Sequence, residues 1–129
     1  MDTPKVAVSW GELFDKITIL QIKLENISRK SALDNIEKEY KQLQVIFSKN
    51  ISADSIANKL LMELKEVNQK LWDIEDKIRD KERKNVFDSD FIQLARSVYI
   101  TNDERSRVKR RINDMLGSEL VEEKSYTEY

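Results

Sequence analysis

The chain has 129 residues, which favours one domain with a modest core, and its 23 Lys and Arg against 24 Asp and Glu give a net charge of −1. This balance provides no overall attraction to nucleic acid or to an anionic membrane. The sequence has no Cys and no His, which excludes disulfides, thiolate nucleophiles, imidazole bases and the usual zinc ligands. With only two Gly and one Pro, an all-β fold with its many turns is disfavoured, and we expect long amphipathic helices.

The amino-terminal segment carries Lys5 and then only Val6, Ala7 and Val8 before polar residues return. This apolar run is too short for the core of a signal peptide. No stretch of the chain approaches the roughly 20 apolar residues of a membrane-spanning helix. We therefore expect a soluble, cytoplasmic protein with no membrane partner.

A first helix is predicted from about residue 10 to residue 29. Ser9 is a good N-cap, and Glu12 three residues later completes a capping box. Ile19 and Ile22 lie on a different side from the main apolar stripe, so this helix is buried on more than one face or meets another subunit. The second alternative predicts a homo-oligomer formed through this helix. The main stripe consists of Leu13, Ile17, Leu20, Leu24 and Ile27.

Capping residues predict three further helices. Ser31 and Asp34 open a short second helix that ends near Ser48. The third and fourth helices occupy about residues 55–84 and 90–116. Their predicted caps are Ser52 or Asp54, then Asp88 or Ser89, with Gly117 at the end of the last helix. Because the turn between these two helices is short, we predict an all-α, four-helix fold dominated by a long antiparallel hairpin, which the first helix crosses and the short second helix closes.

The apolar seam of the third helix faces an interrupted seam on the fourth. The third helix repeats apolar residues at steps of four and three: Leu60, Leu64, Val67, Leu71, Ile74 and Ile78. The fourth begins with Phe91, Leu94, Ala95 and Val98, then carries Asn102, Arg105 and Lys109 before Ile112 and Leu116. Unpaired polar groups on a buried stripe cost several kcal/mol. Either the seam opens there into a polar site, or acidic residues fill it.

A second row on the third helix lies beside the apolar seam, and its residues share one side of the helix: Leu61, Asn68, Trp72, Glu75 and Arg79. Folding the hairpin about residues 86–88 brings this row opposite polar residues of the fourth helix. The predicted cluster contains Trp72, Glu75, Asp76, Arg79, Arg96, Tyr99, Asn102, Asp103 and Arg105. As a ligand pocket, it would bind a phosphate or carboxylate through its arginines and stack a ring on Trp72 or Tyr99.

Specific roles follow if the cluster is a site. Arg96 and Arg105 would bind the anion, Asn102 would orient it, and Glu75 would act as a base or, with Asp103, hold Mg²⁺. The plainer interpretation is structural. Glu75 and Arg79 are then a surface ion pair, as are Asp103 and Arg107, and Asn102 fixes the register of the helices.

The fourth helix also carries a run of cations, and a tail of mixed composition, residues 118–129, follows this helix. The cations spread around the helix with no aromatic residue between 100 and 125, so nucleic-acid binding is disfavoured. We treat residues 1–129 as one domain whose tail is partly folded back, with its tyrosines docked and its glutamates meeting the basic helix end. The cations are Arg105, Arg107, Lys109, Arg110 and Arg111.

Several strings resemble a bacterial family of small helical proteins catalogued only as a domain of unknown function. The most specific are Leu94-Ala95-Arg96-Ser97-Val98-Tyr99 with Thr101-Asn102-Asp103, and Leu116-Gly117-Ser118-Glu119-Leu120 with Glu122-Glu123-Lys124-Ser125-Tyr126. The resemblance covers most of the chain except the second helix and residues 48–58. It implies a discrete domain whose family pattern includes the polar strings, and it assigns no activity.

Two functions remain open on these observations. The first is a non-catalytic module that binds a protein partner, with no cofactor. The second is a ligand-binding protein or small enzyme that acts on a phosphorylated or acidic metabolite through the Arg/Glu/Trp cluster, with Mg²⁺ as its possible cofactor.

Overall fold

The computed structural model describes residues 1–129, and it contains four helices and no strand. The helices are α1 (Trp10–Asn26), α2 (Lys30–Asn50), α3 (Ile56–Arg83) and α4 (Ser89–Leu116). The all-α, four-helix fold predicted from the sequence is therefore confirmed. No helix combines the length and the hydrophobicity that crossing a membrane requires.

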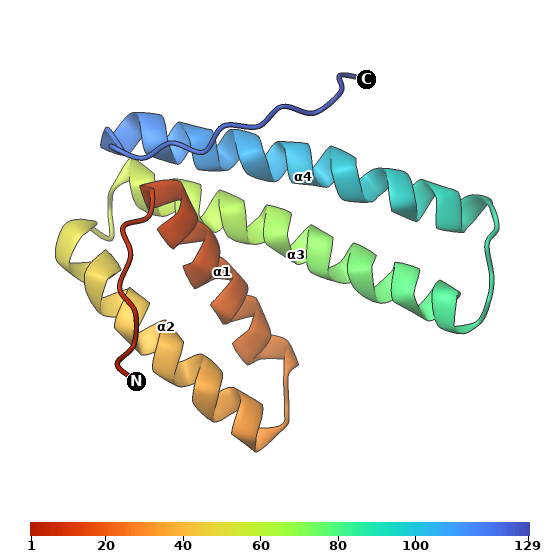
Figure 1. Ribbon diagram of the computed structural model, residues 1–129, viewed down its shortest axis with the longest axis horizontal. Coiled ribbons are helices and arrows are strands. Elements are labelled where there is room, and N and C mark those ends of the chain that lie inside the picture. Colours follow the sequence, from red (N-terminus) through yellow and green to blue (C-terminus); the bar gives the residue numbers. More distant parts are fainter.

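The two longest helices, α3 and α4, lie side by side in opposite directions (Figure 1). Ion pairs fix their register along the hairpin. Arg111 Nη1 lies 2.9 Å from Glu63 Oε1 near one end, and Lys81 Nζ lies 3.1 Å from Asp88 Oδ2 at the turn. In this register, the part of α4 after position 101 lies beside the first half of α3.

Three predicted helix ends are confirmed by their geometry. The Ser9 hydroxyl accepts a hydrogen bond from the Glu12 amide at 3.0 Å, and Asp88 accepts one from the Phe91 amide at 3.0 Å. Gly117 ends α4 with a φ of 60°, a left-handed conformation that glycine adopts without strain.

Other predicted details of the second and third helices are wrong. Helix α2 begins at Lys30 after Arg29, with no side-chain cap, so Ser31 and Asp34 lie inside it. Its 21 residues make it longer than α1 with 17, not short as predicted. Ser55 caps α3 by accepting from the Asn58 amide at 3.2 Å, in place of Ser52 or Asp54. Serine and aspartate clusters offer several equivalent caps, so packing decides which one is used.

The core lies where α1 crosses one end of the hairpin. Phe14, Ile17, Leu64 and Ile112 are fully buried there, and each such side chain contributes roughly 1.5–3 kcal/mol by leaving water. Helix α2 packs on α1 and reaches the core through Phe47, whose ring centroid lies 5.2 Å from that of Phe14. From this end, the α1–α2 pair diverges from the α3–α4 pair (Figure 1).

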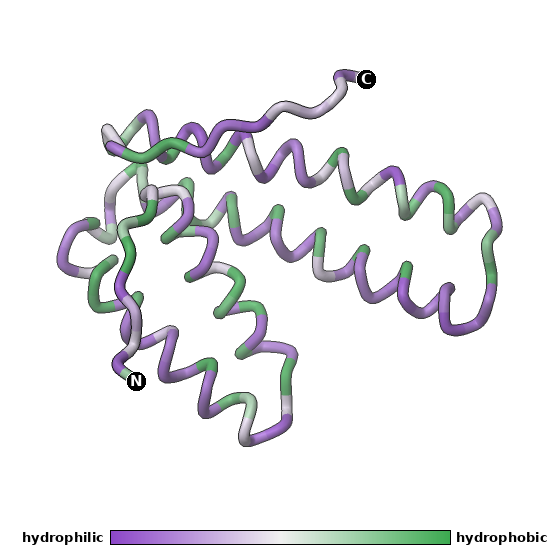
Figure 2. The backbone as a smooth tube through the Cα atoms, viewed as in Figure 1, coloured by the Kyte–Doolittle hydropathy of each residue, from purple (hydrophilic) through white to green (hydrophobic).

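The other end of the hairpin projects beyond α1 as a two-helix arm, residues 69–100, which contains no fully buried residue. The predicted apolar seam accordingly changes along its length. Leu60, Leu64 and Val67 are buried, whereas Leu71 and Ile74 are half-buried because no third helix covers them. Apolar and polar segments alternate along both helices of the arm (Figure 2).

The second apolar face of α1 contacts the rest of the same chain. Ile22 is fully buried, and Ile19 is half-buried at the point where α1 and the arm diverge. Packing within one chain therefore accounts for most of this face, and association through α1 stays a prediction.

Candidate functional site

A buried ion pair joins α1 to α4 at the interrupted seam. The Arg105 guanidinium donates Nε to Asp15 Oδ1 at 2.9 Å and Nη2 to Asp15 Oδ2. Asn68 of α3 donates its amide Nδ2 to Asp15 Oδ1 at 2.9 Å. Asp15 is only 1% exposed, so its charge is matched almost entirely by these groups. A paired, planar contact of this kind also fixes the direction of the arginine.

A second buried cation, Lys109, lies one helical turn beyond Arg105. Its Nζ is 3.0 Å from Glu12 Oε2, 3.3 Å from Glu122 Oε2 and 3.8 Å from Asp15 Oδ2. The acidic partners of the interrupted seam thus come from α1 and from the tail. Placing three carboxylates around one lysine compensates the cost of removing it from water.

Neutral polar groups complete the network. Asn68 Nδ2 also donates to Thr18 Oγ1 at 2.9 Å, and the Thr18 hydroxyl donates to the Phe14 carbonyl at 3.0 Å. No buried side-chain nitrogen or oxygen of the protein lacks a hydrogen-bond partner. A fully satisfied polar network of this kind favours one arrangement of the helices over others.

The close approach of α1 to α4 depends on Gly11. Its amide donates to Asn113 Oδ1 at 2.7 Å, and a Cβ at this position would lie 2.7 Å from the Lys109 carbonyl oxygen. One turn along α1, this approach places Asp15 within reach of Arg105. The first amide of the helix, that of Trp10, donates to Ser118 Oγ at 3.2 Å.

The surroundings of the buried charges hold their pKa values away from neutrality. Burial by itself would raise the pKa of Asp15, but hydrogen bonds from Arg105 and Asn68, with the charges of Arg105 and Lys109, hold it below the ordinary value of 3.8. Burial would lower the pKa of Lys109, whereas its hydrogen bond to Glu12 and the nearby carboxylates hold it above 10.5. Both groups are therefore charged throughout the neutral range.

These pKa shifts predict how stability depends on pH. The contribution of Asp15 is complete above its unfolded pKa of 3.8 and is lost as the pH falls through its lower folded pKa. The contribution of Lys109 is complete below 10.5 and is lost as the pH rises through its higher folded pKa. Urea midpoints should be nearly constant around neutrality and fall below about pH 4. Asp15→Asn should make the acid limb shallower, and an unchanged limb in that variant would contradict the assignment.

Beside this network, a groove of about 530 Å³ opens between α1 and the arm. Its size is within the range of ligand-binding pockets. Six of the nine residues of the predicted cluster line it: Trp72, Glu75, Asp76, Arg79, Asn102 and Arg105. The other lining residues are Ile19, Ile22, Asn68, Leu71 and Val98. The groove thus has apolar walls from three helices and polar groups along α3 and α4.

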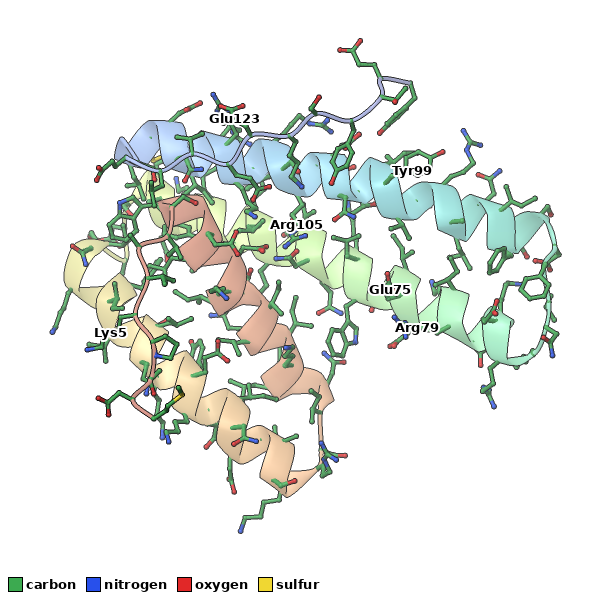
Figure 3. All side chains as sticks on the ribbon, in the orientation of Figure 1. Lys5, Glu75, Arg79, Tyr99, Arg105 and Glu123 are labelled. Carbon is green, nitrogen blue, oxygen red and sulfur yellow. The ribbon has the colours of Figure 1, made fainter.

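Three predicted residues do not line the groove. Arg96 is exposed and has no ion-pair partner. The ring of Tyr99 packs edge-on against Tyr129 of the tail at 5.2 Å, and Asp103 accepts a hydrogen bond from the Tyr129 hydroxyl. Figure 3 shows Tyr99 on α4, apart from Glu75 and Arg79 on α3. Glu75 lines the groove and Asp103 does not, and no group of three or more acidic side chains is placed to hold a metal ion.

The groove has little free positive charge. Arg105 forms an ion pair with Asp15 behind the groove wall. Arg79 Nε is 3.1 Å from Glu75 Oε2 in an i,i+4 pair (Figure 3). Asp76 lines the groove and has no ion-pair partner. The groove therefore presents apolar surface, one tryptophan ring and one carboxylate, that of Asp76, without an ion-pair partner.

The predicted site omitted the residues that organise it, above all Asp15 and Thr18. A signal for them exists in the sequence. Gly11, Asp15, Thr18 and Ile22 repeat at steps of four, three and four, which places small and polar residues on one stripe of α1. All four are buried. A stripe of this kind indicates a close helix contact with polar partners on the facing helix.

Comparison with family models finds a match over residues 4–129 to a family described as a family of unknown function (DUF6165). Comparisons with curated proteins and with solved structures find no match.

Proposed function

The chain belongs to this family of unknown function, whose match extends over residues 4–129, and on that premise we propose its role from its own geometry. In this proposal, the protein is a non-catalytic module that binds an amphipathic helix of a partner protein in the groove between α1 and the arm. The bound helix places apolar side chains against Trp72 and Leu71 and a lysine or arginine near Asp76.

The observation that carries this proposal is the pairing of apolar groove walls with an unpartnered carboxylate. Ile19, Leu71, Trp72 and Val98 come from three different helices and line one groove. Amphipathic helices bind in such grooves through apolar side chains spaced three and four residues apart. Asp76 supplies the preference for a positively charged partner, because the groove arginines already have carboxylate partners.

The buried charges support a binding role over a catalytic one. A general acid or base works best with a pKa near the working pH, whereas Asp15 is shifted downward and Lys109 upward. Each is held by several partners that fix the crossing of α1 over the hairpin. Their contribution to the groove is to hold its walls in place.

An anionic metabolite is the weaker proposal. Arg105 commits two nitrogens of its guanidinium to Asp15, so an anion in the groove would depend mainly on Arg79. The Arg79 side chain is 79% exposed and already paired with Glu75. An exposed pair of this kind contributes little, about 0–1 kcal/mol, to any interaction.

The test uses fluorescence anisotropy with labelled synthetic helices and the full chain. One helix carries a narrow leucine stripe flanked by lysines, and a second has glutamates at the same positions. Inorganic phosphate is added as a competitor for the anion hypothesis. We expect saturable binding of the lysine helix, at least several-fold tighter than binding of the glutamate helix, and no competition by phosphate.

Two groove variants and one matched control sharpen this test. Trp72→Ala should weaken binding of the lysine helix about ten-fold or more, since buried aromatic anchors dominate such interfaces. Asp76→Asn should weaken it by roughly two- to five-fold at low salt. Asp73→Asn removes an acidic residue from the same helix outside the groove and should leave binding unchanged. Equal binding by all variants, or preference for the glutamate helix or phosphate, would contradict the proposal.

A further inference from the structure

The tail, residues 118–129, runs back along α4 in the direction opposite to that helix (Figure 1). Glu122 Oε2 lies 3.3 Å from Lys109 Nζ, and Glu123 Oε1 lies 3.3 Å from Arg110 Nη1. The tail is hydrophilic where it passes these cations, and Glu123 lies over α4 (Figures 2 and 3). An extended acidic segment is thus seated on a cationic strip of α4, which we define as Arg107, Lys109 and Arg110.

Side chains hold most of the tail. Beyond Ser118 it makes no backbone hydrogen bond from its amides to the helices, and none of its residues is buried. Glu122 pairs with the buried Lys109, whereas the Arg110 and Glu123 side chains are 50% and 78% exposed, and an ion pair as exposed as this contributes little. A competing segment with the same carboxylates can therefore replace these side-chain contacts.

The strip also contains a cation that no carboxylate of the tail pairs with. Arg107 is exposed and has no ion-pair partner. It lines a hollow of about 250 Å³ together with Lys109, Arg110 and the tail residue Lys124. The tail places Lys124 in the hollow that Arg107 lines, and Lys124 Nζ lies 3.3 Å from Glu122 Oε1 of the tail itself. A carboxylate at this position would exchange that pair within the tail for an ion pair with Arg107.

We propose that the strip on α4 is a second interaction site, which takes an extended acidic segment of a partner protein and which the tail occupies as an internal competitor. The partner segment carries carboxylates at the positions of Glu122 and Glu123 and a further carboxylate in place of Lys124. This extra charge allows it to compete with the tail, whose local concentration is roughly millimolar because it is tethered. This site shares no residue with the groove between α1 and the arm.

The probe is a labelled peptide with the sequence of residues 118–129, and the protein is the full chain. A released-tail variant, Glu122→Gln with Glu123→Gln and Tyr129→Phe, loses the tail contacts with Lys109, Arg110 and Asp103. We expect the peptide to bind this variant at least five-fold more tightly than it binds the original chain. Because Glu122 also supports Lys109, a second variant that keeps Glu122 and changes only Glu123 and Tyr129 serves if the first does not fold.

Peptide variants test the strip itself. A peptide with Lys124→Glu should bind the released-tail protein several-fold more tightly, and this gain should disappear in Arg107→Ala. Arg96→Ala, an exposed arginine of α4 outside the strip, should change nothing. Equal peptide binding with and without the tail contacts, or a Lys124→Glu gain that survives Arg107→Ala, would overturn the proposal. So would a dimer of the original chain, detected by sedimentation, that the tail substitutions dissociate, because the strip would then take the tail of a second copy.

Discussion

Replacing Asp15 by Asn is expected to lower the free energy of unfolding by about 3 kcal/mol, which for a domain of this size lowers the melting temperature by roughly 10 °C. The change keeps the shape of the side chain, removes its charge and replaces one acceptor oxygen with an NH2 group, which cannot accept from Arg105 or Asn68. Arg105 then loses its carboxylate, and Lys109 loses one of three. Removing one partner of a buried ion pair costs roughly 3–5 kcal/mol, and the 27% exposure of the Arg105 side chain places the effect at the lower limit.

A matched control and a second substitution distinguish the loss of this ion pair from the loss of stability that any Asp→Asn change could cause. Asp73→Asn changes an exposed aspartate of α3, which accepts a side-chain hydrogen bond from Gln69 and has no ion-pair partner, and it should cost less than about 0.5 kcal/mol. In the double variant of Asp15→Asn with Arg105→Gln, the loss should be smaller than the sum of the two single losses by about 1 kcal/mol or more. Urea unfolding followed by circular dichroism provides all of these values. Additive losses, or a loss under about 1 kcal/mol in Asp15→Asn, would show that the pair does not hold α1 on the hairpin.

The second large effect is expected at Gly11. Alanine is the better helix former, so Gly11→Ala in an isolated helix would be stabilising by roughly 0.5–1 kcal/mol. Here the new Cβ would lie 2.7 Å from the Lys109 carbonyl oxygen and 3.0 Å from Asn113 Oδ1, so α1 and α4 must separate. Overpacking against backbone costs about 1–3 kcal/mol, and the separation also weakens the Asp15–Arg105 contact, so we expect a net loss of about 3 kcal/mol.

The other glycine of the chain is the natural control. Gly117 has a φ of 60° and no atom within 4 Å of its hypothetical Cβ. Gly117→Ala should therefore cost about 1 kcal/mol from backbone strain alone. Thermal melts of the two variants should rank Gly11→Ala clearly below Gly117→Ala. The opposite order would mean that α1 does not approach α4 as closely as the Gly11 contacts indicate.

The hairpin was predictable because its signals are local. The three- and four-residue spacing of Leu60, Leu64 and Val67 depends only on helix geometry, and the caps at Ser9 and Asp88 depend on residues three positions away. The interrupted seam also led to a correct prediction, namely that its buried cations need acidic partners. Arg105 and Lys109 face acidic neighbours, as burial on that stripe requires.

The source of those acidic neighbours was not predictable from the hairpin alone. Because a short turn places α3 beside α4, the predicted cluster combined the α4 arginines with α3 residues such as Glu75. The acidic neighbours lie instead on α1 and on the tail, and the position at which α1 crosses depends on long-range contacts such as that of Gly11 with Asn113. Helix phase explains the remaining difference. Arg96, Tyr99 and Asp103 form a stripe displaced by a residue or two from Val98, Asn102 and Arg105, which is enough to turn them out of the groove.

The central claim is that the groove beside Trp72 binds an amphipathic helix with cationic side chains. The most direct test is a nuclear magnetic resonance titration of the isotope-labelled full chain with the lysine-bearing synthetic helix. The account predicts saturable shifts of the Trp72 indole N–H and the Asn102 side-chain amide, while the indole N–H of Trp10 stays unchanged. Shifts confined to α2 or to the tail, with Trp72 and Asn102 unmoved at saturation, would contradict it.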